Sequence, residues 1–339
     1  MSEHLHQRLL NDYQRDFPLV PMPYASLASD LGISEAEVLS ILGKLKAAGS
    51  VSRVGAVLRP GSVGAATLAA MQVPEDRLQD VADIINGQAC VNHNYQREHV
   101  WNMWFVVTAP DREAVVAVLR NIEDRTGLEV LDLPMVRDYF IDLGFDLTGQ
   151  DHDPVPRRQV VRQSQPDPQD RDLLRELERG LPLVSRPWAA LAEAASMTEA
   201  AVIKRLDHLQ DQDIIRRLGV IVRHQELGYT ANAMTVWQVS PGEIDVVGRR
   251  LGALPYVRLC YQRRAHASWP HTLYAMIHGK DREVVLQQIE HARQACGLQD
   301  TSYEVLFSVR RFKQTGGHYL DASDKQQDVS ADVSEVEAA

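Results

Sequence analysis

Residues 17–24, FPLVPMPY, return as LPLVSRPW at residues 181–188, at a constant offset of 164. The motif Arg53-x-Gly55 returns at the same offset as Arg217-x-Gly219. Later matches drift to offsets of 166 and then 170, so the second copy carries four extra residues in that part. A period of this size indicates two fused copies of one domain unit rather than a solenoid.

Each copy begins with three short helical patterns and a β-rich wing. In the first copy Gly32 marks a turn, Ser34-x-x-Glu37 has the spacing of a capping box, and the wing follows at residues 51–58. The order predicts winged helix-turn-helix domains at residues 1–60 and 169–224.

After each wing the sequence pattern predicts a new order of elements: strand, helix, two strands, helix, strand. This βαββαβ order is typical of a ferredoxin-like split βαβ sandwich. The predicted class is therefore α+β, with two tandem copies of a winged helix-turn-helix plus a ferredoxin-like domain. We place the ferredoxin-like domains at residues 61–148 and 225–320, a polar linker at 149–168 and a disordered acidic tail at 321–339.

The composition limits the function classes. The 339 residues are 45% hydrophobic and carry a formal net charge of −10, which argues against a general binder of nucleic acid or anionic membranes. The three cysteines are scattered, as is usual in a reducing compartment, and they form no metal motif. Without a signal-like N-terminus or a long apolar run, we expect a cytoplasmic protein with no membrane partner.

The domain order resembles the Lrp/AsnC family, transcription regulators that dimerise through the second domain and sense small molecules there. The resemblance covers residues from about 5 to 320, taken as two copies. It implies that the fused chain is a pseudo-dimer within itself. Association of two such chains into a homodimer stays open.

The helices that would read DNA are acidic at their N-termini. They begin Ser34-Glu35-Ala36-Glu37 and Met197-Thr198-Glu199, where cationic and amide side chains would be needed to reach bases and phosphates. Tyr24 and Trp188, just before these helices, are interpreted as core residues. We therefore expect no DNA partner and a structural role for the helix-turn-helix.

Two predicted hairpins, at residues 91–104 and 257–279, concentrate histidine, tyrosine, tryptophan and arginine. Strand alternation puts His93, Tyr95 and Arg97 on one face. A flat aromatic face with cations suits a large, planar, polyanionic ligand.

The two copies differ at their histidines. The position matching His93 is Leu259, at offset 166, and the position matching His278 is Thr108, at offset 170. A single strand histidine is commonly a core or surface residue. However, the asymmetry and the nearby Tyr-x-Arg motif favour one composite site that uses both histidines.

Several longer runs resemble the siroheme decarboxylase family, in its form with fused D-type and L-type halves. VNHNYQRE (91–98) and YFIDLGFDL (139–147) are similar to the D-type, and CYQRR (260–264), YAMIHGKDR (274–282) and RRFKQTGG (310–317) to the L-type. The sequence departs from the L-type pattern at Leu259, where histidine is common, and at His271-Thr272, where Tyr-Asn is common.

The resemblance implies conversion of the C12 and C18 acetate side chains of siroheme to methyls, giving didecarboxysiroheme for heme d1 or alternative heme synthesis. It implies no cofactor, since the iron arrives with the substrate, and no intrinsic metal site. His93 and His278 are the candidate general acids, with Tyr95 and Tyr261 as hydrogen-bond partners. The candidate substrate-binding residues are Arg97, Arg258, Arg263, Arg264, Trp101, Trp269, His266 and His271.

Two alternatives remain beside the enzyme. One is a tetrapyrrole-sensing Lrp/AsnC-type transcription regulator, and the other is a binding protein without catalysis. His99, His266 and His271 lie in or near hairpin turns, where solvated surface competes with an axial role on the substrate iron.

Overall fold

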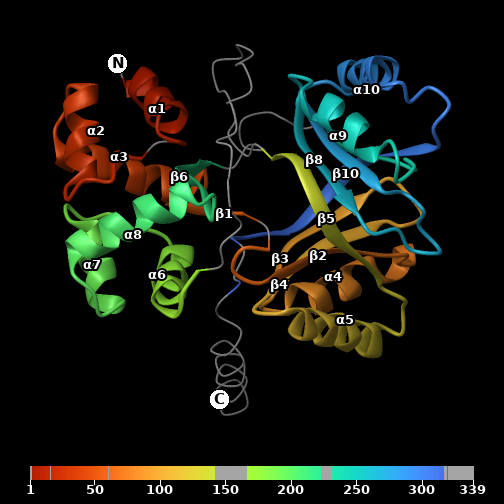
Figure 1. The fold of residues 1–339 in the computed structure, drawn as a ribbon, viewed down its shortest axis with the longest axis horizontal. Helices are drawn as coiled ribbons and strands as arrows, with labels where there is room; N and C mark the ends of the chain where they lie inside the picture. Colours follow the sequence, from red (N-terminus) through yellow and green to blue (C-terminus); the bar gives the residue numbers. More distant parts are fainter. Residues whose placement is uncertain are drawn as a thin grey trace, which may run out of the picture.

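The computed structural model describes residues 2–15, 17–59, 61–141, 166–222, 231–316 and Tyr319. Its helix-turn-helix units lie together on one side and a β-barrel flanked by helices lies on the other (Figure 1). The predicted linker falls largely, and the predicted tail wholly, outside the described residues. No helix in the described ranges is long and apolar enough to span a membrane.

The two helix-turn-helix units form as their local signals predict. Ser34 and Glu37 make a complete capping box, and Gly32 ends the preceding helix with φ 69°. Proline stands in the first turn of α2 and of α7, where its missing N–H is no loss. The first unit comprises α1 (Ser2–Asn11), α2 (Pro23–Leu31), α3 (Glu35–Ala47) and β1 (Val51–Leu58); the second comprises α6 (Pro168–Arg179), α7 (Pro187–Ala194), α8 (Glu199–Asp211) and β6 (Ile215–Val222).

These two units share a single hydrophobic core. Tyr24 and Trp188 are fully buried in it, which confirms their interpretation as core residues. Each donates a hydrogen bond to the other repeat: Tyr24 Oη to the Pro182 carbonyl at 3.2 Å, and Trp188 Nε1 to the Val20 carbonyl at 2.8 Å. The wings β1 and β6 also pair, antiparallel. The aromatic residues thus join the two repeats.

Each repeat then supplies four strands and two main helices, in the predicted βαββαβ order. The first set is β2 (Ala65–Met71), α4 (Leu78–Asn86) after a short 3₁₀ turn η1 (Glu75–Arg77), β3 (Val91–Arg97), β4 (Met103–Ala109), α5 (Arg112–Thr126) and β5 (Leu131–Ile141). The second is β7 (Ala231–Trp237), α9 (Ile244–Gly252), β8 (Val257–Arg263), β9 (Leu273–Gly279), α10 (Arg282–Cys296) and β10 (Tyr303–Gln314).

The last strand of each set is long enough to cross between repeats. Residues 131–134 of β5 pair with β2, and residues 135–141 continue along β8 of the second repeat. Likewise, β10 pairs first with β7 and then with β3. The sheets therefore close into one eight-stranded barrel, in the order β10-β3-β4-β2-β5-β8-β9-β7. Closure removes the open edges that two separate sandwiches would expose.

One part of the barrel interior is packed with aromatic side chains. Trp104 Nε1 donates to the Trp101 carbonyl at 2.6 Å, and Trp269 Nε1 donates to Tyr274 Oη at 2.8 Å. These four residues belong to one core cluster with apolar residues of both repeats.

Candidate functional site

A cavity of about 420 Å³ lies between the wing strands and the barrel. Side chains of β1 and β6 line it on one side, and strands of both repeats line it on the other. It reaches into the barrel as far as Trp104 and Tyr261, where the aromatic packing begins. Neither repeat alone could form this cavity.

The cavity lining is positively charged, whereas the protein as a whole is negatively charged. The described lining residues include five arginines and a single carboxylate, that of Glu178, in a chain of net charge −10. Such a concentration of guanidinium groups suits a ligand with several carboxylates, because each group can hold a carboxylate through two parallel hydrogen bonds. The arginines are Arg53, Arg97, Arg217, Arg258 and Arg263.

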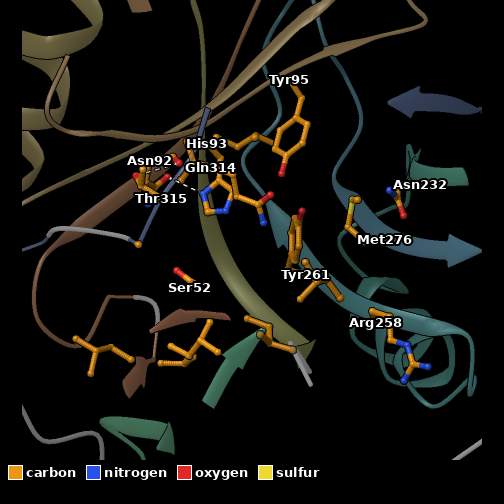
Figure 2. A pocket seen from close by; sticks show the side chains of 18 of the residues that line it. Ser52, Asn92, His93, Tyr95, Asn232, Arg258, Tyr261, Met276, Gln314 and Thr315 are labelled. Carbon is orange, nitrogen blue, oxygen red and sulfur yellow. Dashed lines mark hydrogen bonds between the residues drawn. The ribbon is translucent and has the colours of Figure 1, made fainter. Parts of the chain in front are cut away.

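Both unmatched histidines line the cavity, one from each repeat. His93 lies on β3 and stacks beside Tyr95, with ring centroids 6.2 Å apart. Its Nδ1 lies 3.0 Å from Oδ1 of the buried Asn92 (Figure 2). His278 lies on β9, where its partner across the ladder is the buried Asn232. Each histidine therefore has an asparagine as a near neighbour.

The equivalent residues Tyr95 and Tyr261 also line the cavity. Figure 2 shows their hydroxyl ends pointing toward one another. Burial raises the pKa of Tyr95, while Arg97 and Arg311 oppose the shift, so this phenol is a neutral hydrogen-bond donor at physiological pH.

Arg97 and Arg263 are buried beside these tyrosines. The Arg263 guanidinium carbon lies 4.6 Å from the centre of the Tyr261 ring, and that of Arg97 lies 5.9 Å from the Tyr95 ring. Each Nη1 donates to a carbonyl of a crossing strand: Arg97 to Leu306 at 3.0 Å and Arg263 to Leu133 at 2.7 Å. Burial lowers the pKa of Arg97 to about 10, which still leaves it cationic at neutral pH.

Seven of the twelve predicted site residues thus line the same cavity: His93, His278, Tyr95, Tyr261, Arg97, Arg258 and Arg263. The others are not among its described lining residues. Trp101 and Trp269 lie in the aromatic packing, and Arg264 is exposed. His266 lies in the turn before β9, and His271 is buried with its ring 4.6 Å from that of Trp269. His99, left open in the sequence analysis, packs on the same tryptophan at 5.3 Å.

Arg53, Arg217 and Asn92 also line the cavity but were not predicted from the sequence to belong to the site. A signal for the two arginines was present, since Arg-x-Gly is repeated in both wings. Its location in a helix-turn-helix domain suggested a structural role. Asn92 could be placed only once the neighbouring strands fixed its direction.

Two family models match this chain, each in two copies. One, described as an AsnC-like ligand binding domain, matches residues 62–139 and 226–313. The other, described as a siroheme decarboxylase NirDL-like HTH domain, matches residues 6–51 and 170–216.

Relatives resemble the chain over nearly its whole length. The siroheme decarboxylase NirDL subunit of Paracoccus denitrificans is 43% identical over 318 residues, covering 92% of this chain and 96% of the relative. A crystal structure of the siroheme decarboxylase NirDL aligns with a TM-score of 0.68, at 28% identity and 94% coverage of both chains. A second crystal structure, of NirDL in co-complex with an iron-uroporphyrin III analogue, aligns with a TM-score of 0.67, at 27% identity and 95% coverage of both chains.

Proposed function

Since the chain belongs to the siroheme decarboxylase family of NirDL type, we propose that it converts the C12 and C18 acetate side chains of siroheme to methyl groups. The observation that carries this proposal is a single cavity with five arginines and two histidines from different repeats. Siroheme is a planar macrocycle with eight carboxylates. The product would be didecarboxysiroheme, an intermediate suited to the synthesis of heme d1 or of heme.

The arginines account for substrate binding. A guanidinium remains charged when buried and presents a planar pair of donors to a carboxylate. Arg97 Nε and Arg263 Nε are buried and have no hydrogen-bond partner in the described part of the chain. Each of these N–H groups can therefore donate a hydrogen bond to a ligand carboxylate. A charged hydrogen bond of this kind contributes roughly 1.5 to 3 kcal/mol.

The histidines account for the chemistry. When the bond from the acetate methylene to its carboxylate breaks, CO2 leaves and the electron pair remains on the methylene carbon, where the tetrapyrrole can delocalise it. One proton delivered to that carbon completes the methyl group. An imidazolium is a suitable general acid near neutral pH. We assign this step to His93 for one acetate and to His278 for the other.

Asn92 would fix the protonation pattern of His93. An amide oxygen accepts a hydrogen bond, so its position 3.0 Å from Nδ1 favours a hydrogen on that nitrogen. Nε2 is then the nitrogen that exchanges a proton with the substrate. In this proposal Tyr95 and Tyr261 donate hydrogen bonds to substrate carboxylates, and the only metal is the substrate iron.

Anaerobic incubation with siroheme, followed by mass analysis of the tetrapyrrole, tests the function. We expect two successive losses of CO2 with the parent chain and none with heat-denatured chain. Siroheme that remains unchanged while bound to the folded protein would refute the proposed reaction.

The runner-up is a tetrapyrrole-sensing transcription regulator. Contacts at the N-termini of the helices that would read DNA speak against it: Ser185 of the second repeat donates to Glu35 at 3.0 Å, and Glu199 pairs with Arg186. Both helix starts are therefore engaged within the protein, and at Glu35 the contact comes from the other repeat. The decarboxylase therefore remains the preferred function.

A further inference from the structure

The wing strands bring one arginine each to the cavity from the helix-turn-helix side. Arg53 on β1 and Arg217 on β6 are equivalent in the repeat, and both line the cavity. In the β1–β6 ladder they lie on either side of a central pair, Gly55 with Gly219. The two arginines are thus related by the same approximate symmetry as Arg97 and Arg263 in the barrel.

The chain leaves space for the side chain of Arg53 by placing glycines around it. A Cβ atom at Gly55 would lie 3.1 Å from Arg53 Nε, and one at Gly180 would lie 3.1 Å from Arg53 Cβ. A Cβ atom at Gly316 would lie only 2.5 Å from Arg53 Nη1. Gly55 on the same strand, together with Gly180 and Gly316 from two segments distant in sequence, therefore leaves room for one long cation.

The hydrogen bonding of Arg53 is incomplete. Its Nη2 donates to the Ala56 carbonyl at 3.3 Å, whereas its buried Nε has no hydrogen-bond partner in the described residues. Burial lowers the pKa of Arg53, and the charge of Glu178 opposes this shift. A buried cation is costly unless anions or acceptors surround it. A ligand carboxylate would supply them.

Glu178 is the one carboxylate among the described lining residues, and it already accepts a hydrogen bond from the Tyr319 backbone N–H at 3.0 Å. The position that matches Glu178 in the first repeat is Gln14, which is uncharged. Arg217, in which the side chain is also buried, lines the same cavity. Among the described lining residues, the wing side of the cavity therefore has two guanidiniums and one carboxylate.

We propose that Arg53 and Arg217 bind carboxylate side chains of the tetrapyrrole from the wing side, opposite Arg97 and Arg263 of the barrel. The helix-turn-helix domains are then part of the substrate site. This inference rests on the proposed function, because it requires a ligand with carboxylates on more than one side. It also gives a reason for the presence of wings in a chain with acidic reading helices.

Absorbance titration with iron-uroporphyrin tests the inference. Arg53→Met and Arg217→Met remove the charge but keep most of the length, and Arg53→Lys and Arg217→Lys restore the charge. The control is Arg175→Met on α6, where a partly exposed arginine outside the cavity lining pairs with Asp172. We expect each cavity Met variant to bind about 10- to 100-fold more weakly, the Lys variants to recover part of the loss, and the control to match the parent.

Equal affinities for the Met, Lys and parent chains would overturn the inference. Equal losses of affinity in the Met and Lys variants would also overturn it, because they would show that packing rather than charge is responsible. Thermal unfolding checks each fold, and Arg→Gln replaces any Met variant that does not fold. A parent that binds iron-uroporphyrin but leaves siroheme intact refutes the proposed function alone. A parent that decarboxylates siroheme, with Met variants of parental affinity, refutes this inference alone.

Discussion

His93 and His278 come from different strands and different repeats, and their counterparts are Leu259 and Thr108. Because the repeat does not relate these two positions to one another, the proposed reaction can assign one histidine to each acetate. If histidines deliver the protons and arginines bind the substrate, histidine variants should lose turnover and arginine variants should lose binding. The two effects can be measured separately.

We predict that His93→Ala and His278→Ala retain tetrapyrrole binding but lose turnover by ~10²-fold or more, the usual scale for removal of a general acid. One variant should accumulate the monodecarboxylated product, while the other stalls at siroheme. Absorbance spectra report binding, and mass analysis reports turnover. His266→Ala, outside the described cavity lining, is the control. If both variants decarboxylated siroheme at the parental rate, the general acid would be a different group.

His271 is a second residue whose protonation can be tested. Burial, with a smaller contribution from the charge of His99, lowers its pKa from 6.5 to about 4. The unfolded chain therefore takes up this proton first as the pH falls. The stability linked to the neutral ring is complete above pH 6.5 and is lost between pH 6.5 and 4, by at most ~3 kcal/mol.

We predict that His271→Phe, which keeps an aromatic ring beside Trp269 but cannot titrate, loses less unfolding free energy than the parent between pH 7 and pH 5. Denaturant unfolding at several pH values measures the difference. His266→Phe, in the turn before β9, controls for a new phenyl ring. A parental pH dependence in His271→Phe would assign the loss to other groups.

At the scale of elements, local signals were sufficient for the helices and for most strands. The capping box at Ser34 and the repeat itself predicted the two units. The crossing of β5 and β10 was not predictable, because a strand pattern shows which face is buried but not which strand will be its neighbour. The cavity depends on that crossing, so its wing side was missed although both Arg-x-Gly motifs were visible.

The end of β10 offers a test of the wing side that leaves Arg53 in place. We predict that Gly316→Ala lowers the affinity for iron-uroporphyrin, because its new methyl group would displace the Arg53 guanidinium. The unfolding free energy should change by only about 0.5 kcal/mol, since the obstructed atom is the end of a flexible side chain. Gly242→Ala, where a Cβ atom meets nothing within 4 Å, is the control. Parental affinity in Gly316→Ala would contradict the placement of Arg53.

At the scale of the whole molecule, the shared helical core and the shared barrel leave the two repeats as one unit. The acidic helix starts contact protein groups of their own, as in the pair of Ser185 with Glu35. We predict that the chain binds duplex DNA no better than a generic acidic protein at physiological salt, because its charge repels phosphates. If nanomolar concentrations of the protein formed a sequence-specific complex with the DNA upstream of its own gene, the regulator would be favoured instead.

The two repeats build one site between them. Titration of the purified chain with iron-uroporphyrin, followed by absorbance at a protein concentration well above Kd, measures the stoichiometry directly. Because the cavity takes His93 from one repeat and His278 from the other, we predict one tetrapyrrole per chain. Two equivalent tetrapyrroles per chain would contradict it.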